Sequence, residues 1–185
     1  MMGISVAIMT GGRSRRMGSD KALLKCEDSR TYLERICDEM SVFSHKYLSV
    51  NEYEDYASIN EYIRVVDEND DIGPLGGLCA LLSKIETEAV LILAVDMPKY
   101  TIAEATEICS RYRGEDILIA NDGTRLQPLA AIYNKRILPI VKEQIACNEY
   151  GMMKLYEKVA GVGGDVGVFE SGHAERYVNQ NTVLT

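Results

Sequence analysis

Residues 11–25 gather side chains that could bind phosphate. Two adjacent glycines, Gly11 and Gly12, precede five basic side chains and one acid, in a chain whose net charge is -8. Glycines let backbone N–H groups come close to an anion, and arginine and lysine neutralise phosphate charge. The pattern therefore predicts a phosphate-binding loop. A solvated basic turn, in which the glycines only make the bend, is the alternative.

Two common phosphate motifs do not fit this loop. The P-loop consensus G-x-x-x-x-G-K-[ST] fails because Gly12 and Gly18 are six positions apart and Ser19 follows Gly18. The dinucleotide fingerprint G-x-G-x-x-G is absent as well. If the loop binds phosphate, it belongs to another class of phosphate-binding protein; the solvated basic turn stays as the alternative.

The elements that must position this loop alternate between strand and helix. Strands are predicted at 5–9, 46–51, 62–66, 89–95, 116–121 and 126–134, the last two as a hairpin around 122–123. Helices are predicted after the capping boxes Thr31–Glu34 and Thr101–Glu104, after residue 77, over 135–147 and from about 151. The alternation favours an α/β fold with three α/β/α layers and a mostly parallel central sheet.

Three stretches with polar character follow predicted strands. They are the loop at 11–25, the acidic segment that begins at Asp67, and Asp96, which follows the apolar run 89–95. A strand that is apolar on every side needs cover on both faces, so 89–95 is expected to be a central parallel strand. Ligands of such sheets bind at the carboxyl ends of the strands, where all three stretches are expected.

Composition narrows the class of protein. The chain has 185 residues and 46% hydrophobic content, which favours one domain over 1–185. Twenty basic against 28 acidic side chains argue against general nucleic-acid binding. Neither a signal peptide nor an apolar run of about 18 residues is evident, and no two of the five cysteines form C-x-x-C. We expect a cytoplasmic protein that binds neither nucleic acid nor membrane.

The segment "GGRSRRMGSDKALL" (11–24) resembles the signature G-G-x-x-x-R-M-G-x-D-K-x-L of nucleotidyltransferases, and is most similar to that of the molybdenum cofactor guanylyltransferases. Further segments resemble the same family in the same order, namely those at 50–52, 65–77, 95–98, 127–134 and 178–182. The resemblance covers essentially the whole chain. It implies a Rossmann-like nucleotidyltransferase fold and transfer of GMP from GTP to molybdopterin-bound molybdenum, with release of pyrophosphate.

The resemblance also implies roles for individual residues. The implied nucleotide-binding set is Met9, Thr10, Gly11, Gly12, Lys21, Asn51, Asp67 and Asp96. Arg16 and Lys21 match the cations that hold the triphosphate, and Asp96 matches the Mg²⁺ ligand, so these three are the implied catalytic residues. Asp67 is the candidate for base recognition, because a carboxylate accepts well from guanine N1–H and N2–H₂. Met9-Thr10 replaces a common Leu-Ala, a change that leaves a backbone role intact.

The acceptor side and the alternatives complete the prediction. By resemblance, Gly76, Gly77, Asn179 and Asn181 border the acceptor side of the cleft, although the two glycines could equally serve tight helix packing. Expected partners are GTP, molybdopterin, and a molybdoenzyme or insertion chaperone that receives the product. A cytidylyl- or sugar-phosphate transferase of the same fold and a GTP-binding regulatory module without turnover stay open as alternatives.

Overall fold

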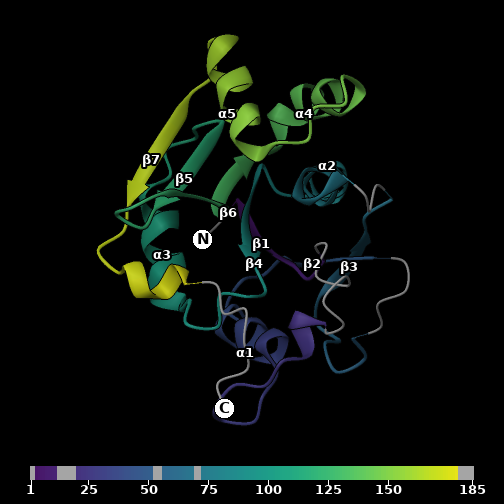
Figure 1. The fold of residues 1–185 in the computed structure, drawn as a ribbon, viewed down its shortest axis with the longest axis vertical. Helices are drawn as coiled ribbons and strands as arrows, with labels where there is room; N and C mark the ends of the chain where they lie inside the picture. The colour runs from purple at the N-terminus through teal and green to yellow at the C-terminus, as the bar shows by residue number, and fades with distance from the viewer. Residues whose placement is uncertain (1–2, 12–19, 52–55, 69–71, 179–185) are drawn as a thin grey trace.

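The structure is a computed structural model, and it describes residues 3–11, 20–51, 56–68 and 72–178 (Figure 1). Strands in these ranges form one seven-stranded sheet with the order β3-β2-β1-β4-β6-β5-β7. The strands are β1 (Ile4–Met9), β2 (Lys46–Val50), β3 (Ile63–Val66), β4 (Ala89–Ala94), β5 (Ile117–Asn121), β6 (Leu126–Asn134) and β7 (Val166–Glu170).

Helices cover both faces of this sheet. The α-helices are α1 (Tyr32–Glu39), α2 (Pro74–Lys84), α3 (Ile102–Arg111), α4 (Leu138–Ala146) and α5 (Met152–Gly161), and the short 3₁₀ helices are η2 (Lys21–Leu23), η4 (Lys135–Ile137) and η5 (Ala174–Tyr177). Apolar residues of α1 and α3 pack on one face. Those of α2, α4 and α5 pack on the other (Figure 1). The predicted three-layer α/β fold is confirmed.

The sheet is mixed rather than uniformly parallel. β3, β2, β1 and β4 run parallel to one another, and β7 runs parallel to β5. β6 is antiparallel to both β4 and β5, because the predicted hairpin returns the chain at Gly123, whose φ is +89°. The strand over 89–94 is central and fully buried, as expected, but it is parallel only to β1 and antiparallel to β6.

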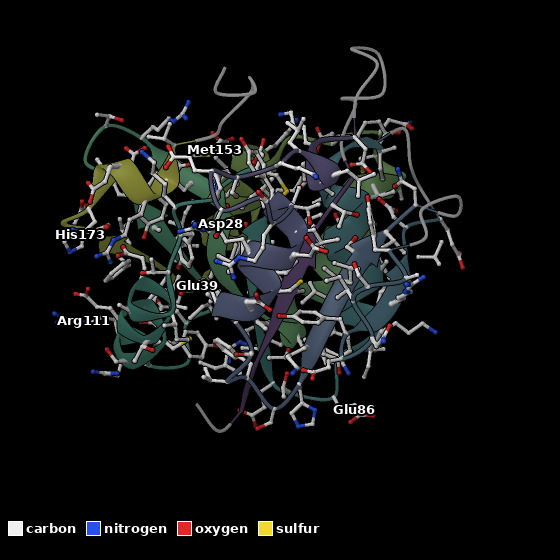
Figure 2. All side chains as sticks on the ribbon, turned by 90° about the horizontal axis from the view of Figure 1, so that it is seen from below. Asp28, Glu39, Glu86, Arg111, Met153 and His173 are labelled. Carbon is white, nitrogen blue, oxygen red and sulfur yellow. The ribbon has the colours of Figure 1, made fainter. Side chains whose placement is uncertain are left out.

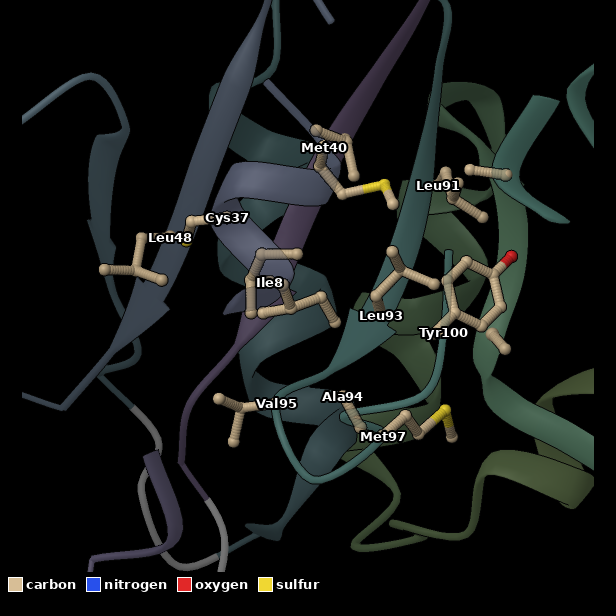
Figure 3. Packing of buried hydrophobic residues seen from close by; sticks show 14 of the residues in the cluster. Ile8, Cys37, Met40, Leu48, Leu91, Leu93, Ala94, Val95, Met97 and Tyr100 are labelled. Atoms are coloured by element: carbon tan, nitrogen blue, oxygen red, sulfur yellow. The ribbon is translucent and has the colours of Figure 1, made fainter. Parts of the chain in front are cut away.

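The core holds the end of β4 in place. Ile8 of β1 and Leu93 of β4 pack in one cluster with Met40, which follows α1 (Figure 3). After β4 the cluster continues through Val95 and Met97, which are 4% and 1% exposed. Burying each such side chain contributes roughly 1.5–3 kcal/mol. Residue 96, which lies between two buried side chains, is therefore carried on a firmly anchored segment.

Only the first of the two predicted capping boxes forms. Thr31 Oγ1 accepts a hydrogen bond from the Glu34 backbone N–H at 3.1 Å, and Thr31 N–H donates to the Glu34 carboxylate at 2.8 Å. At α3 the prediction is wrong, because the Thr101 side chain makes no cap. The first turn is capped instead from α1, where Glu39 Oε2 accepts from the Ile102 N–H at 2.9 Å.

Among the described residues, histidines and cysteines form neither a metal-type cluster nor a disulfide. His173 is exposed and lies at the margin of the molecule beside η5 (Figure 2). All five cysteines are free thiols. In the part of the chain that the structure describes, no helix is long and apolar enough to cross a membrane.

Candidate functional site

The carboxyl ends of β1 to β4 meet at one edge of the sheet. The strand register aligns Met9 with both Ser49 and Ala94, and Val50 with Val66. The residues that follow these ends are Thr10 and Gly11 after β1, Asn51 after β2, Asp67 after β3 and Asp96 after β4. Four segments far apart in the sequence therefore supply polar groups to the same edge.

Lys21 and Asp96 form an ion pair at this edge. Lys21 Nζ donates to Asp96 Oδ2 at 2.9 Å, and the two side chains are 25% and 14% exposed. The pair is thus shielded from water in part but remains reachable. A cation and a carboxylate in contact at a strand end can serve a phosphate and a phosphate-bound metal, respectively.

Sequence reasoning missed the residues that orient Lys21. Asp20 is the N-cap of η2, and its Oδ1 accepts from the Ala22 N–H at 2.9 Å. Its other oxygen, Oδ2, accepts from the Tyr56 hydroxyl at 3.0 Å, and Arg64 Nη2 donates to the Tyr56 carbonyl at 2.9 Å. The aspartate before the lysine is a local cap signal. Nothing in the sequence pattern points to Tyr56.

The side chains of Met9 and Thr10 point into the protein. These are the two residues that replace the Leu-Ala pair common in the family that the sequence resembles. The Thr10 hydroxyl donates to the Ser49 carbonyl at 2.7 Å, and the Thr10 N–H reaches the same carbonyl at 3.2 Å. Met9 is 5% exposed and packs in the cluster beneath α2. These side chains therefore support the strand ends and leave the backbone role of the segment intact.

Gly11 and Asn51 lie in close contact across β1 and β2. A Cβ atom added to Gly11 would lie 2.9 Å from Asn51 Oδ1. Only a residue without a side chain leaves Asn51 in its present position. The glycine therefore fixes where a side-chain amide stands at the edge of the site.

The glycines of α2 bring that helix close to the site. α2 begins after Gly73, with φ +74°, and has Pro74 in its first turn, as expected for a helix start. Gly76 and Gly77 are buried, and a Cβ at Gly77 would lie 2.5 Å from Met9 Cε and 2.9 Å from Ser49 Oγ. The packing role that the sequence left open is therefore supported for Gly77.

Asp67 stands next to the same helix. Its N–H donates to the Val50 carbonyl at 2.9 Å, which extends the pairing of β2 and β3 by one residue. A Cβ at Gly77 would lie 3.7 Å from Asp67 Oδ2. The carboxylate therefore lies between the end of β3 and the first turn of α2, on the β2 side of the edge.

Four predicted site residues lie outside the described ranges. They are Gly12, Arg16, Asn179 and Asn181. Among the described residues, no three His, Cys, Asp or Glu side chains gather into a metal-binding cluster. A single carboxylate at Asp96 fits an ion such as Mg²⁺, which takes one or two carboxylates and fills its other positions with phosphate oxygens and water.

Comparisons with known proteins show the family of this chain. The MobA-like NTP transferase domain matches residues 6–162. A probable molybdenum cofactor guanylyltransferase of Flavobacterium johnsoniae is 32% identical over 84% of this chain and 82% of that protein.

Solved structures share the fold. Molybdopterin-guanine dinucleotide biosynthesis protein A of Archaeoglobus fulgidus has a TM-score of 0.79 at 19% identity, over 96% of this chain and 92% of that one. A Mycobacterium tuberculosis protein solved in complex with manganese has a TM-score of 0.67 at 15% identity, over 92% and 89%. At these identities the likeness concerns the fold alone.

Proposed function

The chain belongs to the MobA-like NTP transferase family, and we propose that it transfers GMP from GTP to molybdopterin-bound molybdenum and releases pyrophosphate. The observation that carries the proposal is the Lys21–Asp96 pair at the carboxyl edge of the sheet. A family relative at 32% identity carries the name of this guanylyltransferase activity.

The proposed reaction is a direct transfer. An oxygen of the terminal phosphate of molybdopterin attacks the α-phosphorus of GTP, the new P–O bond forms, and the bond to the β-phosphate oxygen breaks. The electron pair of the broken bond leaves with pyrophosphate. A phosphate monoester is already anionic at neutral pH, so no side-chain nucleophile is needed. Catalysis then rests on positioning and on stabilising charge in the transition state.

Each residue of the edge has a part in this proposal. Lys21, together with Arg16, stabilises charge on the triphosphate and on the departing pyrophosphate. Gly11 lets the backbone approach the nucleotide, and Asn51 contacts it from the neighbouring strand end. On the acceptor side we assign Gly76, Gly77, Asn179 and Asn181, of which only the glycines fall within the described ranges.

A divalent metal fits the carboxylate of Asp96. Asp96 is anchored by buried neighbours, and its carboxylate stands beside the cation proposed to hold phosphate. We propose Mg²⁺ as the ion, held by Asp96 and by phosphate oxygens. Such an ion supplies positive charge that neutralises the phosphates during transfer.

Base recognition is assigned to Asp67. A carboxylate accepts from both N1–H and N2–H₂ of guanine, a donor pair that cytosine lacks. The fold by itself does not settle which base is used, because related folds host several chemistries. The cytidylyl transferase therefore stays as the second candidate, and the Gly11-Gly12 pair favours the guanylyl reaction over it.

Pyrophosphate release tests the proposal. The purified chain is given molybdopterin that carries molybdenum, Mg²⁺, and one of GTP, CTP, ATP or UTP. Release with GTP alone is expected. Release with CTP instead would favour the cytidylyl reaction, and binding of GTP without release, given a competent acceptor, would favour a regulatory module.

A further inference from the structure

A cavity lies beside the segment that carries Asp96. It has a volume of about 220 Å³. Its walls come from the loop before α1, from the start of α1 and from the loop after β4. Pro98 and Lys99 belong to this wall and follow Asp96 by two and three positions. The cavity therefore adjoins the proposed site of phosphoryl chemistry without containing its residues.

The wall of the cavity carries more positive than negative charge. Lys25, Arg35 and Lys99 line it from three different segments, and Glu27 is the one acid in the wall. Within the described part of the chain, neither Lys25 nor Lys99 forms an ion pair or a side-chain hydrogen bond, and Lys25 acts only through its charge, which adds to the capping hydrogen bonds that lower the pKa of Glu34. Two lysines are thus available to an anionic ligand.

Arg35 adds a donor that the protein itself does not satisfy. Its Nε is buried and has no hydrogen-bond partner among the described residues. Its Nη1 lies 3.6 Å from Asp28 Oδ2, while Arg30 Nη2 holds that same oxygen at 2.6 Å. A buried, unsatisfied N–H costs free energy, and a ligand oxygen would recover it. Arg35 lines the cavity, so an acceptor atom placed there would lie beside its guanidinium group.

The other titratable groups of the wall, Cys26 and Tyr32, add no negative charge to it. Burial raises the pKa of the Cys26 thiol, although the nearby Arg35 opposes the shift, so the thiol is neutral at pH 7. Burial also raises the pKa of Tyr32, and the charges of Cys26 and Asp96 raise it further. The phenol of Tyr32 is thus neutral, and it feels the electrostatic field of Asp96.

We propose that this cavity, the Lys25–Arg35–Lys99 site, binds a small phosphate-type anion, either inorganic phosphate or pyrophosphate. Three cations from separate segments, one of them with an unsatisfied donor, match the oxygens of such an anion. The pyrophosphate form of the proposal rests on the proposed function, which produces pyrophosphate next to Asp96. The inorganic phosphate form does not depend on it.

Calorimetric titration tests the site on the full chain without nucleotide or metal. Inorganic phosphate and pyrophosphate are titrated separately into the wild type, into Lys25→Ala/Lys99→Ala and into Arg35→Lys. Arg35→Lys keeps a positive charge but loses the Nε donor, and circular dichroism checks that every variant is folded. Lys21→Ala serves as the control for binding at the proposed nucleotide site, and Lys154→Ala, on the exposed surface of α5, serves as the control for charge alone.

The expected result is that both cavity variants weaken anion binding by about tenfold or more, while Lys21→Ala and Lys154→Ala bind at least one anion as the wild type does. Tighter binding of pyrophosphate than of phosphate supports the pyrophosphate form of the proposal, and the reverse order supports the inorganic phosphate form. Three results would overturn the proposed site. They are loss of anion binding only in Lys21→Ala, equal anion binding by all variants, and the absence of saturable binding to the wild type. None of these results depends on whether GTP is turned over, so the proposed function is judged separately by its own assay.

Discussion

Lys21 Nζ lies 2.9 Å from Asp96 Oδ2, although 75 positions of sequence separate the two residues. Without nucleotide, each side chain neutralises the other. In the proposed reaction Lys21 faces the triphosphate and Asp96 faces a metal, so both charges gain new partners when Mg²⁺-GTP binds. The ion pair therefore keeps the two groups together at the edge before the substrate arrives.

Removing either member of this pair is expected to abolish most activity with little effect on stability. For Lys21→Ala and Asp96→Ala we expect transfer to fall by about 100-fold or more, since fixed charges at a transition state are worth that much. The free energy of unfolding should change by about 1 kcal/mol or less, because the pair is partly exposed. Pyrophosphate release and urea unfolding measure the two effects.

Lys46→Ala is the matched control for this prediction. It removes a lysine–carboxylate pair of similar geometry, Lys46 Nζ to Glu61 Oε2 at 2.7 Å, at a distance from the carboxyl edge. Its activity should equal that of the wild type. Folded Lys21→Ala and Asp96→Ala proteins with near wild-type transfer would remove both residues from the catalytic set.

The Asp67 carboxylate is expected to set the preference for guanine. Asp67→Asn replaces one acceptor oxygen by a donor, which faces the N1–H and N2–H₂ donors of the base. We expect GTP binding to weaken by roughly 10- to 100-fold, the cost of an unpaired buried donor. Competition of GTP and CTP for the protein measures the change. An unaltered ratio of the two affinities would show that another residue reads the base.

Gly77 is expected to tolerate no side chain. A Cβ there would lie 2.5 Å from Met9 Cε and 2.9 Å from Ser49 Oγ, so Gly77→Ala must displace these buried side chains or the helix itself. We expect a loss of about 1–3 kcal/mol in the free energy of unfolding. Gly161→Ala, at the end of α5 with nothing within 4 Å, is the control and should be neutral or stabilising. Equal stabilities of the two variants would contradict the close approach of α2.

Local patterns predicted six of the seven strands in the described residues and missed β7 (Val166–Glu170), whose glycine-rich stretch has weak patterning. The apolar run 89–95, the hairpin at 122–123 and the capping box at Thr31 are each encoded within a few residues, and the structure contains all three. Since β1 to β4 are parallel, their ends must share an edge. This is why the loop that begins at Gly11, the segment that begins at Asp67, and Asp96 could be placed together from the sequence, whereas Asn51 was implied only by the family resemblance.

Long-range contacts could not be predicted in this way. The Thr101–Glu104 box has the correct spacing, yet Glu104 has partners 67 to 73 positions later in the chain. The Tyr56–Asp20 hydrogen bond likewise spans 36 positions. Periodicity and capping rules describe neighbours along the chain, so a side chain that is claimed by a distant segment escapes them.

Asp122 is expected to make stability depend on acid pH. Burial by itself would raise the pKa of Asp122, but hydrogen bonds from Thr124, Arg125 and Gln127 outweigh it and lower the pKa to about 2. The folded state then binds the proton more weakly than the unfolded state, whose pKa is 3.8. The contribution, about 2 kcal/mol, is complete above about pH 4 and is lost as the pH falls toward 2.

Urea unfolding of the wild type and of Asp122→Asn at pH 7, 4 and 3 checks this prediction. The wild type should be more stable by about 2 kcal/mol at pH 7, and the difference should shrink at pH 3. If the difference in the free energy of unfolding stayed constant across these pH values, the hydrogen bonds of Asp122 would stabilise the fold without lowering the pKa of its carboxyl group.

Glu104 is expected to hold the C-terminal 3₁₀ helix η5 on α3. Its side chain is fully buried. One oxygen, Oε2, accepts from Arg176 Nη1 at 2.8 Å, and the other, Oε1, accepts from the hydroxyls of Ser171 and Tyr177. The ring of Tyr177 packs edge-on against Tyr100 beside them. One carboxylate thus ties the segment just before residues 179–181 to the body of the fold.

Glu104→Gln removes the negative charge that pairs with Arg176. It also replaces one acceptor oxygen by an amide N–H₂ group, which faces side chains that are themselves hydrogen-bond donors. We expect a loss of about 3–5 kcal/mol, the cost of breaking a buried ion pair, and faster proteolysis within 171–177. Glu175→Gln is the control, because Glu175 is 65% exposed and contacts His173 only at 3.5 Å. Urea unfolding and timed proteolysis of both variants provide the comparison. If Glu104→Gln were as stable and as protease-resistant as Glu175→Gln, packing of Tyr177 against Tyr100 would have to hold η5 without the carboxylate.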